Sequence, residues 1–96
     1  MKKKFDIFIN KSCEYYGINP SELFQKGGPL IRADARYLLY FLCTRAGMRN
    51  TLIYSYVLKK GFSLNKSDIS RGVAKWQERV EFDEDLYVDI KNMEEK

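Results

Sequence analysis

The sequence has no histidine and only two cysteines, Cys13 and Cys43, among its 96 residues. Two thiols without an imidazole cannot supply the four ligands of a usual zinc site. A hydroxyl or thiol nucleophile would likewise lack its commonest general base. We therefore expect no enzymatic activity, no metal and no cofactor. Because free cysteines are most often buried, we expect two small core residues, with a disulfide as the alternative.

Long apolar runs are also missing. No segment approaches the roughly 20 apolar residues that cross a bilayer, so we expect no membrane partner. The basic start MKKKFDIFIN is interrupted by Asp6 and Asn10 and has no small-residue cleavage site, unlike a signal peptide. These absences favour a cytoplasmic protein.

The residues that are present are typical of one small globular domain over residues 1–96, with 45% apolar and 15% aromatic residues. Apolar residues recur at helical spacing, and no stretch alternates as a strand does. We predict an all-α fold with about six helices. Four are expected over about 4–16, 20–25, 31–46 and 51–60. A fifth follows a cap at Asn65 or Ser67 and ends near 79, and an acidic C-terminal helix covers about 83–94.

Local chemistry supports several of these boundaries. Asn19 and Glu22 have the spacing of a capping box, with Pro20 at the first helical position between them. Asn50 is a candidate cap for the fourth helix. Gly72 costs about 1 kcal/mol relative to alanine inside the fifth helix. It is therefore either tolerated there or needed for the close approach of another helix.

Positive charge is concentrated in the middle of the chain. The net charge of +4 divides into +1 over residues 1–25, +8 over residues 26–80 and −5 over residues 81–96. A basic segment attracts polyanions and releases their counterions on binding. The location of the charge therefore favours a nucleic-acid partner more than its total does.

The basic segment contains two helix-like stretches, over about 50–79, that are separated by a short break at Gly61. A bracing helix, a turn and a second helix with one apolar and one basic edge make up a helix-turn-helix. The apolar edge of the second helix consists of Ile69, Val73, Trp76 and Val80, and the basic edge of Ser67, Arg71, Lys75 and Arg79. We predict that this helix enters the major groove of double-stranded DNA.

Four stretches of the sequence follow one another in an order that is typical of a known domain: EYYGINPSELF, ADARYLLYFLCTRAG, TLIYSYVLKKGF and SDISRGVAKW. That order resembles the C-terminal DNA-binding domain of the bacterial replication initiator DnaA, over about residues 5–93. The resemblance implies a Trp-repressor-like helix-turn-helix in a stand-alone relative of phage or mobile-element type. It also implies a role in replication or transcription regulation, in a bacterial cell or a phage-infected host.

In that family, DNA contacts come from a Gly-Arg-Asp-His-Thr-Thr-Val run that opens the recognition helix, and from a basic loop before the long helix. Residues 65–69 stand at the Asp-to-Val positions here, and only Ser67 and Ile69 are conservative replacements. Asp68 places a negative charge where a DNA-binding donor is expected. A glycine-rich segment over 27–29 replaces the arginine-rich part of the loop.

The candidate DNA-binding residues form two groups. One belongs to the recognition helix and comprises Asn65, Lys66, Ser67, Ser70, Arg71 and Lys75; the other belongs to the loop and the long helix and comprises Lys26, Arg32 and Arg36. Arg71 is the candidate base reader, because a guanidinium can bridge O6 and N7 of guanine. The alternative for both groups is an ordinary solvated helix face.

A second hypothesis is a protein-interaction module on the same fold that has lost DNA binding. It is motivated by Asp68, by the glycines in the loop and by the acidic C-terminal segment. Its partner would be a replication or host protein, or another copy of the chain. The sequence leaves the oligomeric state and the target DNA sequence open.

Overall fold

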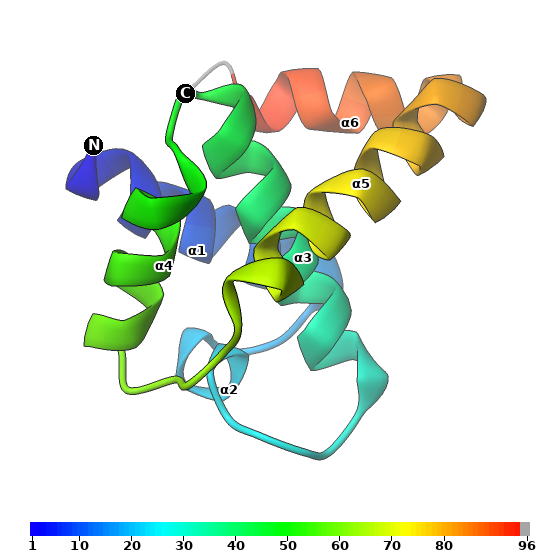
Figure 1. The fold of residues 1–96 in the computed structure, drawn as a ribbon. Coiled ribbons are helices and arrows are strands. Elements are labelled where there is room, and N and C mark those ends of the chain that lie inside the picture. The colour runs from blue at the N-terminus through cyan, green and yellow to red at the C-terminus, as the bar shows by residue number, and fades with distance from the viewer. Residues whose placement is uncertain (95–96) are drawn as a thin grey trace.

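The long helix α3 (Leu30–Arg45) lies at the centre of the structure, a computed structural model that describes residues 1–94 (Figure 1). Around it lie α1 (Lys2–Tyr16), α2 (Pro20–Leu23), α4 (Asn50–Lys59), α5 (Lys66–Phe82) and α6 (Glu84–Glu94). The predicted all-α fold with six helices is confirmed for these residues. The predicted domain also includes Glu95 and Lys96, which lie outside the described part of the chain.

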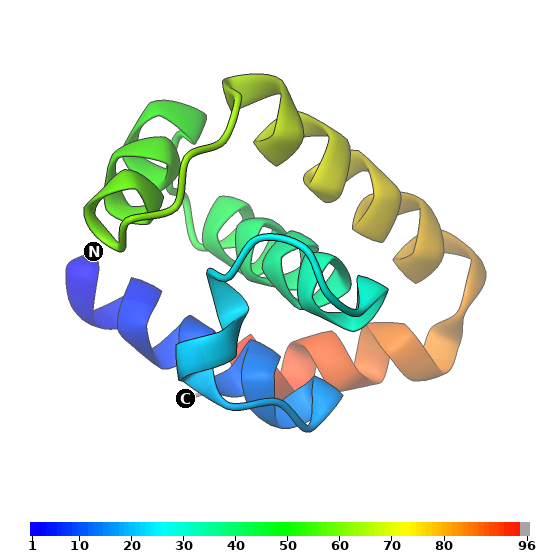
Figure 2. The ribbon, with the colours of Figure 1, turned by 90° about the horizontal axis from the view of Figure 1, so that it is seen from below.

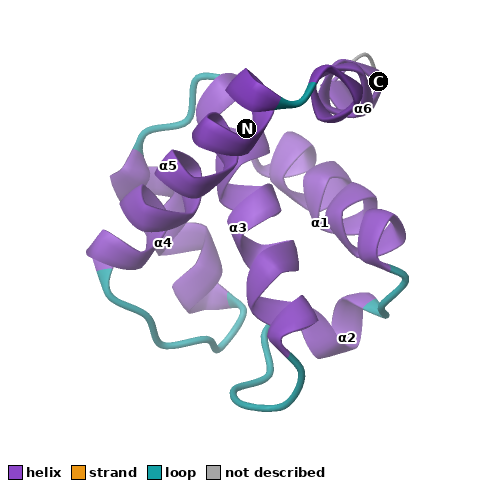
Figure 3. Cartoon of the chain, turned by 90° about the vertical axis from the view of Figure 1, so that its right-hand side faces the viewer, coloured by secondary structure: helices purple, strands orange, loops and turns teal. Residues whose placement is uncertain are grey.

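The central position of α3 follows from its composition. Every side chain from Leu38 to Cys43 is at most 1% exposed, so this helix is buried on all sides along its middle. Its two largest interfaces are with α1 and α5. Figure 3 shows α3 running between α1 on one side and α4 and α5 on the other. α3 is therefore the scaffold on which α5 is positioned.

Most helix ends follow the expected local chemistry. Gly17 ends α1 in the left-handed conformation, with φ 68°. At α2, the Asn19 N–H donates to Glu22 Oε2 at 3.2 Å, as the predicted capping box requires. Asp83 caps the start of α6, because its carboxylate accepts the Leu86 N–H at 3.3 Å. This cap also sets the end of α5, which continues to Phe82 rather than stopping near residue 79.

One predicted cap is wrong. The residue before α4 is Arg49, and Asn50 is already the first residue of the helix. The Asn50 amide instead donates to Ser70 Oγ on α5 at 3.0 Å. Asn50 therefore links α4 to α5 rather than closing the start of its own helix.

The connection between α4 and α5 turns at Gly61, whose φ of 84° lies in the left-handed region. Phe62 and Leu64 both bury their side chains under this turn. Further along α5, a Cβ on Gly72 would lie 3.2 Å from the Cα of Tyr37 on α3. The glycine is therefore needed for the close approach of the two helices.

Both cysteines are free and buried, as the first of the two alternatives predicted. Trp76 is also buried, at 1% exposure, and its ring stacks on Phe41 with centroids 6.3 Å apart. None of the helices within residues 1–94 is both long enough and apolar enough to cross a bilayer.

Candidate nucleic-acid interface

The first half of α5 is open to solvent on the side that faces away from α3. Ile69 and Gly72 are buried, whereas four polar side chains on the other side are exposed: Lys66, Ser67, Ser70 and Arg71. We refer to these four residues as the exposed α5 face. Figure 2 shows α5 along the outer edge of the molecule, with α3 on its inner side. The Arg71 side chain is 74% exposed and lies on this face.

Asp68 belongs to the start of the helix rather than to the exposed α5 face. Its carboxylate accepts the Asn65 N–H at 3.1 Å and completes a capping box with Asn65. It also lies 3.6 Å from the Arg71 guanidinium, one turn further on. A carboxylate is favourable here because the first turn of a helix carries a partial positive charge. The Asn-x-x-Asp spacing over residues 65–68 is the sequence signal for this role, which was not predicted.

The bracing helix α4 adds two contacts beside this face. Asn50 donates to Ser70, as described above, and the Lys66 ammonium lies 5.5 Å from the centroid of the Tyr54 ring. Asn50 and Tyr54 were not among the predicted site residues. They fix the start of α5 against α4 and restrict where Lys66 and Ser70 can reach.

The second half of the basic edge is already paired. Lys75 Nζ lies 3.7 Å from Asp34 Oδ1 on α3, and Arg79 Nη2 lies 3.9 Å from the same oxygen. The Lys75 ammonium also lies 5.6 Å from the Tyr37 ring centroid. The predicted basic edge therefore runs along the whole helix, but its cations are more exposed near the start of α5, at Arg71, than further along, at Lys75 and Arg79.

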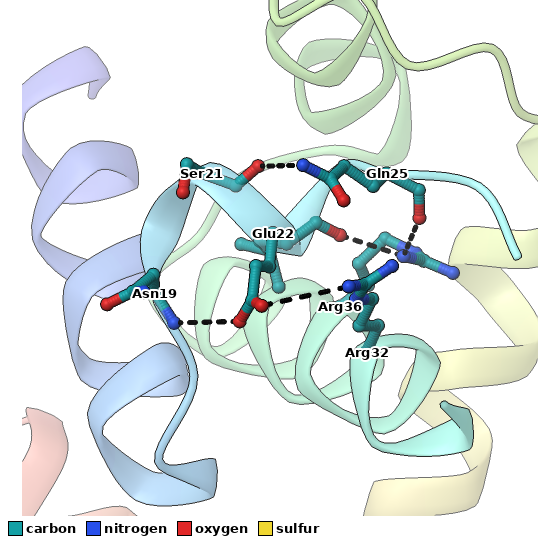
Figure 4. Close-up of polar contacts among 7 residues, drawn as sticks. Asn19, Ser21, Glu22, Gln25, Arg32 and Arg36 are labelled. Carbon is teal, nitrogen blue, oxygen red and sulfur yellow. Dashed lines mark hydrogen bonds and ion pairs between the residues drawn. The ribbon is translucent and has the colours of Figure 1, made fainter. Parts of the chain in front are cut away.

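The two arginines of the second predicted group hold α2 in place (Figure 4). Arg36 Nη1 donates to the Leu23 carbonyl at 2.8 Å, and its guanidinium lies 4.5 Å from the Phe62 ring centroid. Arg32 pairs with Glu22 at 3.7 Å. Burial is the largest effect on Arg36 and lowers the pKa of its guanidinium. DNA contact by these two residues stays a prediction, and it would compete with the contacts to α2.

Lys26 is exposed in the loop that follows α2. The loop is fixed to the turn before α5, because the Phe24 and Phe62 rings lie 6.0 Å apart. Gly27 and Gly28 carry it onward with φ values of 74° and 76°. The structure thus places Asn65 and the exposed α5 face together, leaves Lys26 exposed in the loop, and engages Arg32, Arg36 and Lys75 in contacts within the fold.

The main groove on the surface lies away from the exposed α5 face. An open groove of about 260 Å³ is lined by Lys11, Glu14, Tyr15, Asn92 and Met93, at the side where α1 meets α6. Within residues 1–94, no three cysteine or acidic side chains converge as they would around a metal ion. α5 therefore remains the surface with the clearest pattern of polar side chains.

Comparison with known proteins gave no match to a protein-family model, to a curated protein or to a solved structure. The resemblance to the DnaA domain therefore stays a prediction from the order of the sequence segments.

Proposed function

We propose that this protein binds double-stranded DNA by inserting the first half of α5 into the major groove. The observation that carries the proposal is the exposed α5 face, on a helix whose opposite side is buried against α3. A helix that is fixed on one side and open on the other can enter a groove without disturbing the core. The predicted relationship to an initiator DNA-binding domain adds a role in replication or transcription regulation to the proposal.

The residues of this face suit different parts of a DNA duplex. Arg71 is the candidate base reader, since its guanidinium is open to solvent and can donate two parallel hydrogen bonds to guanine. Lys66 and Ser67 lie in the first turn of α5, where the helix dipole and free amides favour a phosphate. Lys26 lies in the neighbouring loop and would add a contact to the DNA backbone.

A binding titration with a preferred duplex, selected from random sequences, tests this function. Arg71→Ala should cost about 1–3 kcal/mol on the preferred site and relax the sequence preference. Lys91→Ala is the matched control, because Lys91 is an exposed cation on α6. An Arg71→Ala protein with unchanged affinity and preference would remove Arg71 as the reader. No binding by the native chain at about 100 mM salt and micromolar protein would contradict the function itself.

One observation favours the second function, a protein-interaction module. Phe82 is 83% exposed where α5 meets α6, and Tyr87 and Val88 on α6 are about half exposed. Large apolar side chains on a surface often mark a protein contact. If the native chain does not bind DNA, sedimentation of Phe82→Ser against the native protein will show whether this corner mediates self-association.

A further inference from the structure

Along the basic edge of α5, Arg71 pairs with Asp68 within its own helix and stays 74% exposed, whereas Lys75 and Arg79 pair with Asp34 on α3. We propose that Asp34 sets the DNA affinity of α5 by holding Lys75 and Arg79 against α3, which confines DNA contact to the exposed α5 face. This inference rests on the proposed DNA-binding function and names the residue that limits it. Asp34 is thus a positioning residue, acting through two cations.

The position of Asp34 follows from the packing of the two helices. α5 approaches α3 most closely where Gly72 meets Tyr37. Asp34 lies one helical turn before Tyr37, and Lys75 and Arg79 lie one and two turns after Gly72. The Asp34 carboxylate therefore lies beside both cations, 3.7 Å from Lys75 Nζ and 3.9 Å from Arg79 Nη2.

Aromatic rings hold the two cations in these positions. The Lys75 ammonium lies near Tyr37, and the Arg79 guanidinium lies 5.2 Å from the Trp76 ring centroid. Tyr16 of α1 completes the surroundings. Burial, followed by the charge of Asp34, raises the pKa of the Tyr16 phenol to about 12, while Arg79 acts in the opposite direction. The Asp34 carboxylate therefore interacts electrostatically with side chains of two other helices, α1 and α5.

The two parts of the basic edge pair with different carboxylates, Asp68 on α5 itself and Asp34 on α3. Asp68 lies near Arg71 but also accepts the Asn65 N–H, and the Arg71 side chain stays 74% exposed. Lys75 and Arg79 share one carboxylate, and both are less exposed than Arg71. Ion pairs near a surface are individually weak, so a phosphate can compete with Asp34 but gains less than it would from free cations.

The test compares Asp34→Asn with Glu78→Gln. Glu78 is an exposed acid on α5 that makes none of the ion pairs found within residues 1–94, so both variants remove one negative charge. Binding to one duplex is measured over a range of salt concentrations. Each added phosphate contact steepens the dependence of log K on log salt by about 0.9. We expect Asp34→Asn to bind more tightly and to steepen this slope by about one to two, and Glu78→Gln to leave the slope unchanged.

Lys75→Ala in both backgrounds provides a second readout. In the native background it should change the salt slope by clearly less than the roughly 0.9 that one phosphate contact contributes. In the Asp34→Asn background its effect should be clearly larger. Circular dichroism of each variant checks that it is folded. Equal slopes for Asp34→Asn and Glu78→Gln, or equal effects of Lys75→Ala in both backgrounds, would overturn the role of Asp34.

Elution from a heparin column separates this inference from the DNA-binding function. Heparin is a polyanion without base pairs, so the difference in elution between Asp34→Asn and Glu78→Gln reports the availability of Lys75 and Arg79 without base readout. If the native chain does not bind duplex DNA but Asp34→Asn elutes at higher salt than Glu78→Gln, the proposed function fails and the role of Asp34 in holding the cations stands. Identical elution of the two variants would overturn that role whatever the DNA result.

Discussion

At the scale of single residues, Gly72 and Asp68 each resolve a conflict between two local preferences. Gly72 lowers the helix propensity of α5 but lets the backbone approach Tyr37. Asp68 adds a negative charge to a basic helix but closes its first turn through the Asn65 N–H. In both cases the contact gives the reason for a residue that propensity or charge alone disfavours.

Gly72→Ala gives the corresponding prediction. Helix propensity alone would stabilise the variant by about 1 kcal/mol. The new Cβ would lie 2.7 Å from Tyr37 Cδ1 and 3.2 Å from its Cα, so the backbone of α3 must shift. Overpacking of this kind costs about 1–3 kcal/mol, and we expect a net loss of stability in urea unfolding. Ser67→Ala, at an exposed position of the same helix, should change stability by less than about 0.5 kcal/mol. A gain of stability in Gly72→Ala would show that the two helices are not in close contact.

At the scale of elements, α6 differs from the other long helices because a small part of its surface is buried. Ile90 is its one fully buried side chain. Two polar contacts supplement it: the Tyr15 hydroxyl donates to Asp89 at 3.3 Å, and Arg45 Nε donates to Glu94 at 2.6 Å. With Ile90 fully buried and Leu86 and Met93 only partly buried against the core, α6 is expected to open before the core does.

Ile90→Ala tests the attachment of α6. Removing this buried side chain should cost about 2–5 kcal/mol and speed hydrogen exchange most strongly at the amides of α6. Val88→Ala is the matched control on the same helix, because Val88 is 53% exposed. Exchange in Ile90→Ala that rises equally in α3 and α6 would instead show that α6 opens only with the whole fold.

At the scale of the whole molecule, the core consists of uncharged side chains, and the excess positive and negative charges belong to different segments of the chain. The phenols of Tyr16 and Tyr40 and the thiol of Cys43 are all embedded near α3. Burial is the largest effect on each and raises all three pKa values, to about 12 for Tyr16 and Cys43. The folded state therefore favours the protonated forms of these groups.

This preference predicts a loss of stability in alkali. The folded pKa values lie above the ordinary values of 9.0 for the thiol and 10.0 for the phenols. The stabilisation is complete below those ordinary values and is lost as the pH rises toward 12, because the unfolded chain ionises first. Urea unfolding should show a fall of roughly 1 kcal/mol or more between pH 9 and 11. Tyr40→Phe and Tyr16→Phe should each reduce that fall, and an unchanged pH profile in both would contradict the assignment.

The sequence by itself determined the number of helices, most of their ends and the buried side of each. These features depend on residues within one or two turns of each other, such as Asn19 with Glu22, or on the apolar spacing within one helix. The same local information covered the turn at Gly61 and the burial of Trp76. The Asn65 and Asp68 spacing at the start of α5 is local information of the same kind.

Only the tertiary structure decided which of the basic residues are free. Arg36 contacts the Leu23 carbonyl, and Lys75 and Arg79 contact Asp34, which lies more than 40 residues earlier in the chain. Asn50 likewise finds its partner on another helix. Helical periodicity places a side chain on a face of its own helix but carries no information on what a distant helix brings to that face. The packing of α5 on α3 at Gly72 therefore selected Arg71, rather than the whole basic edge, as the charge most available to a partner.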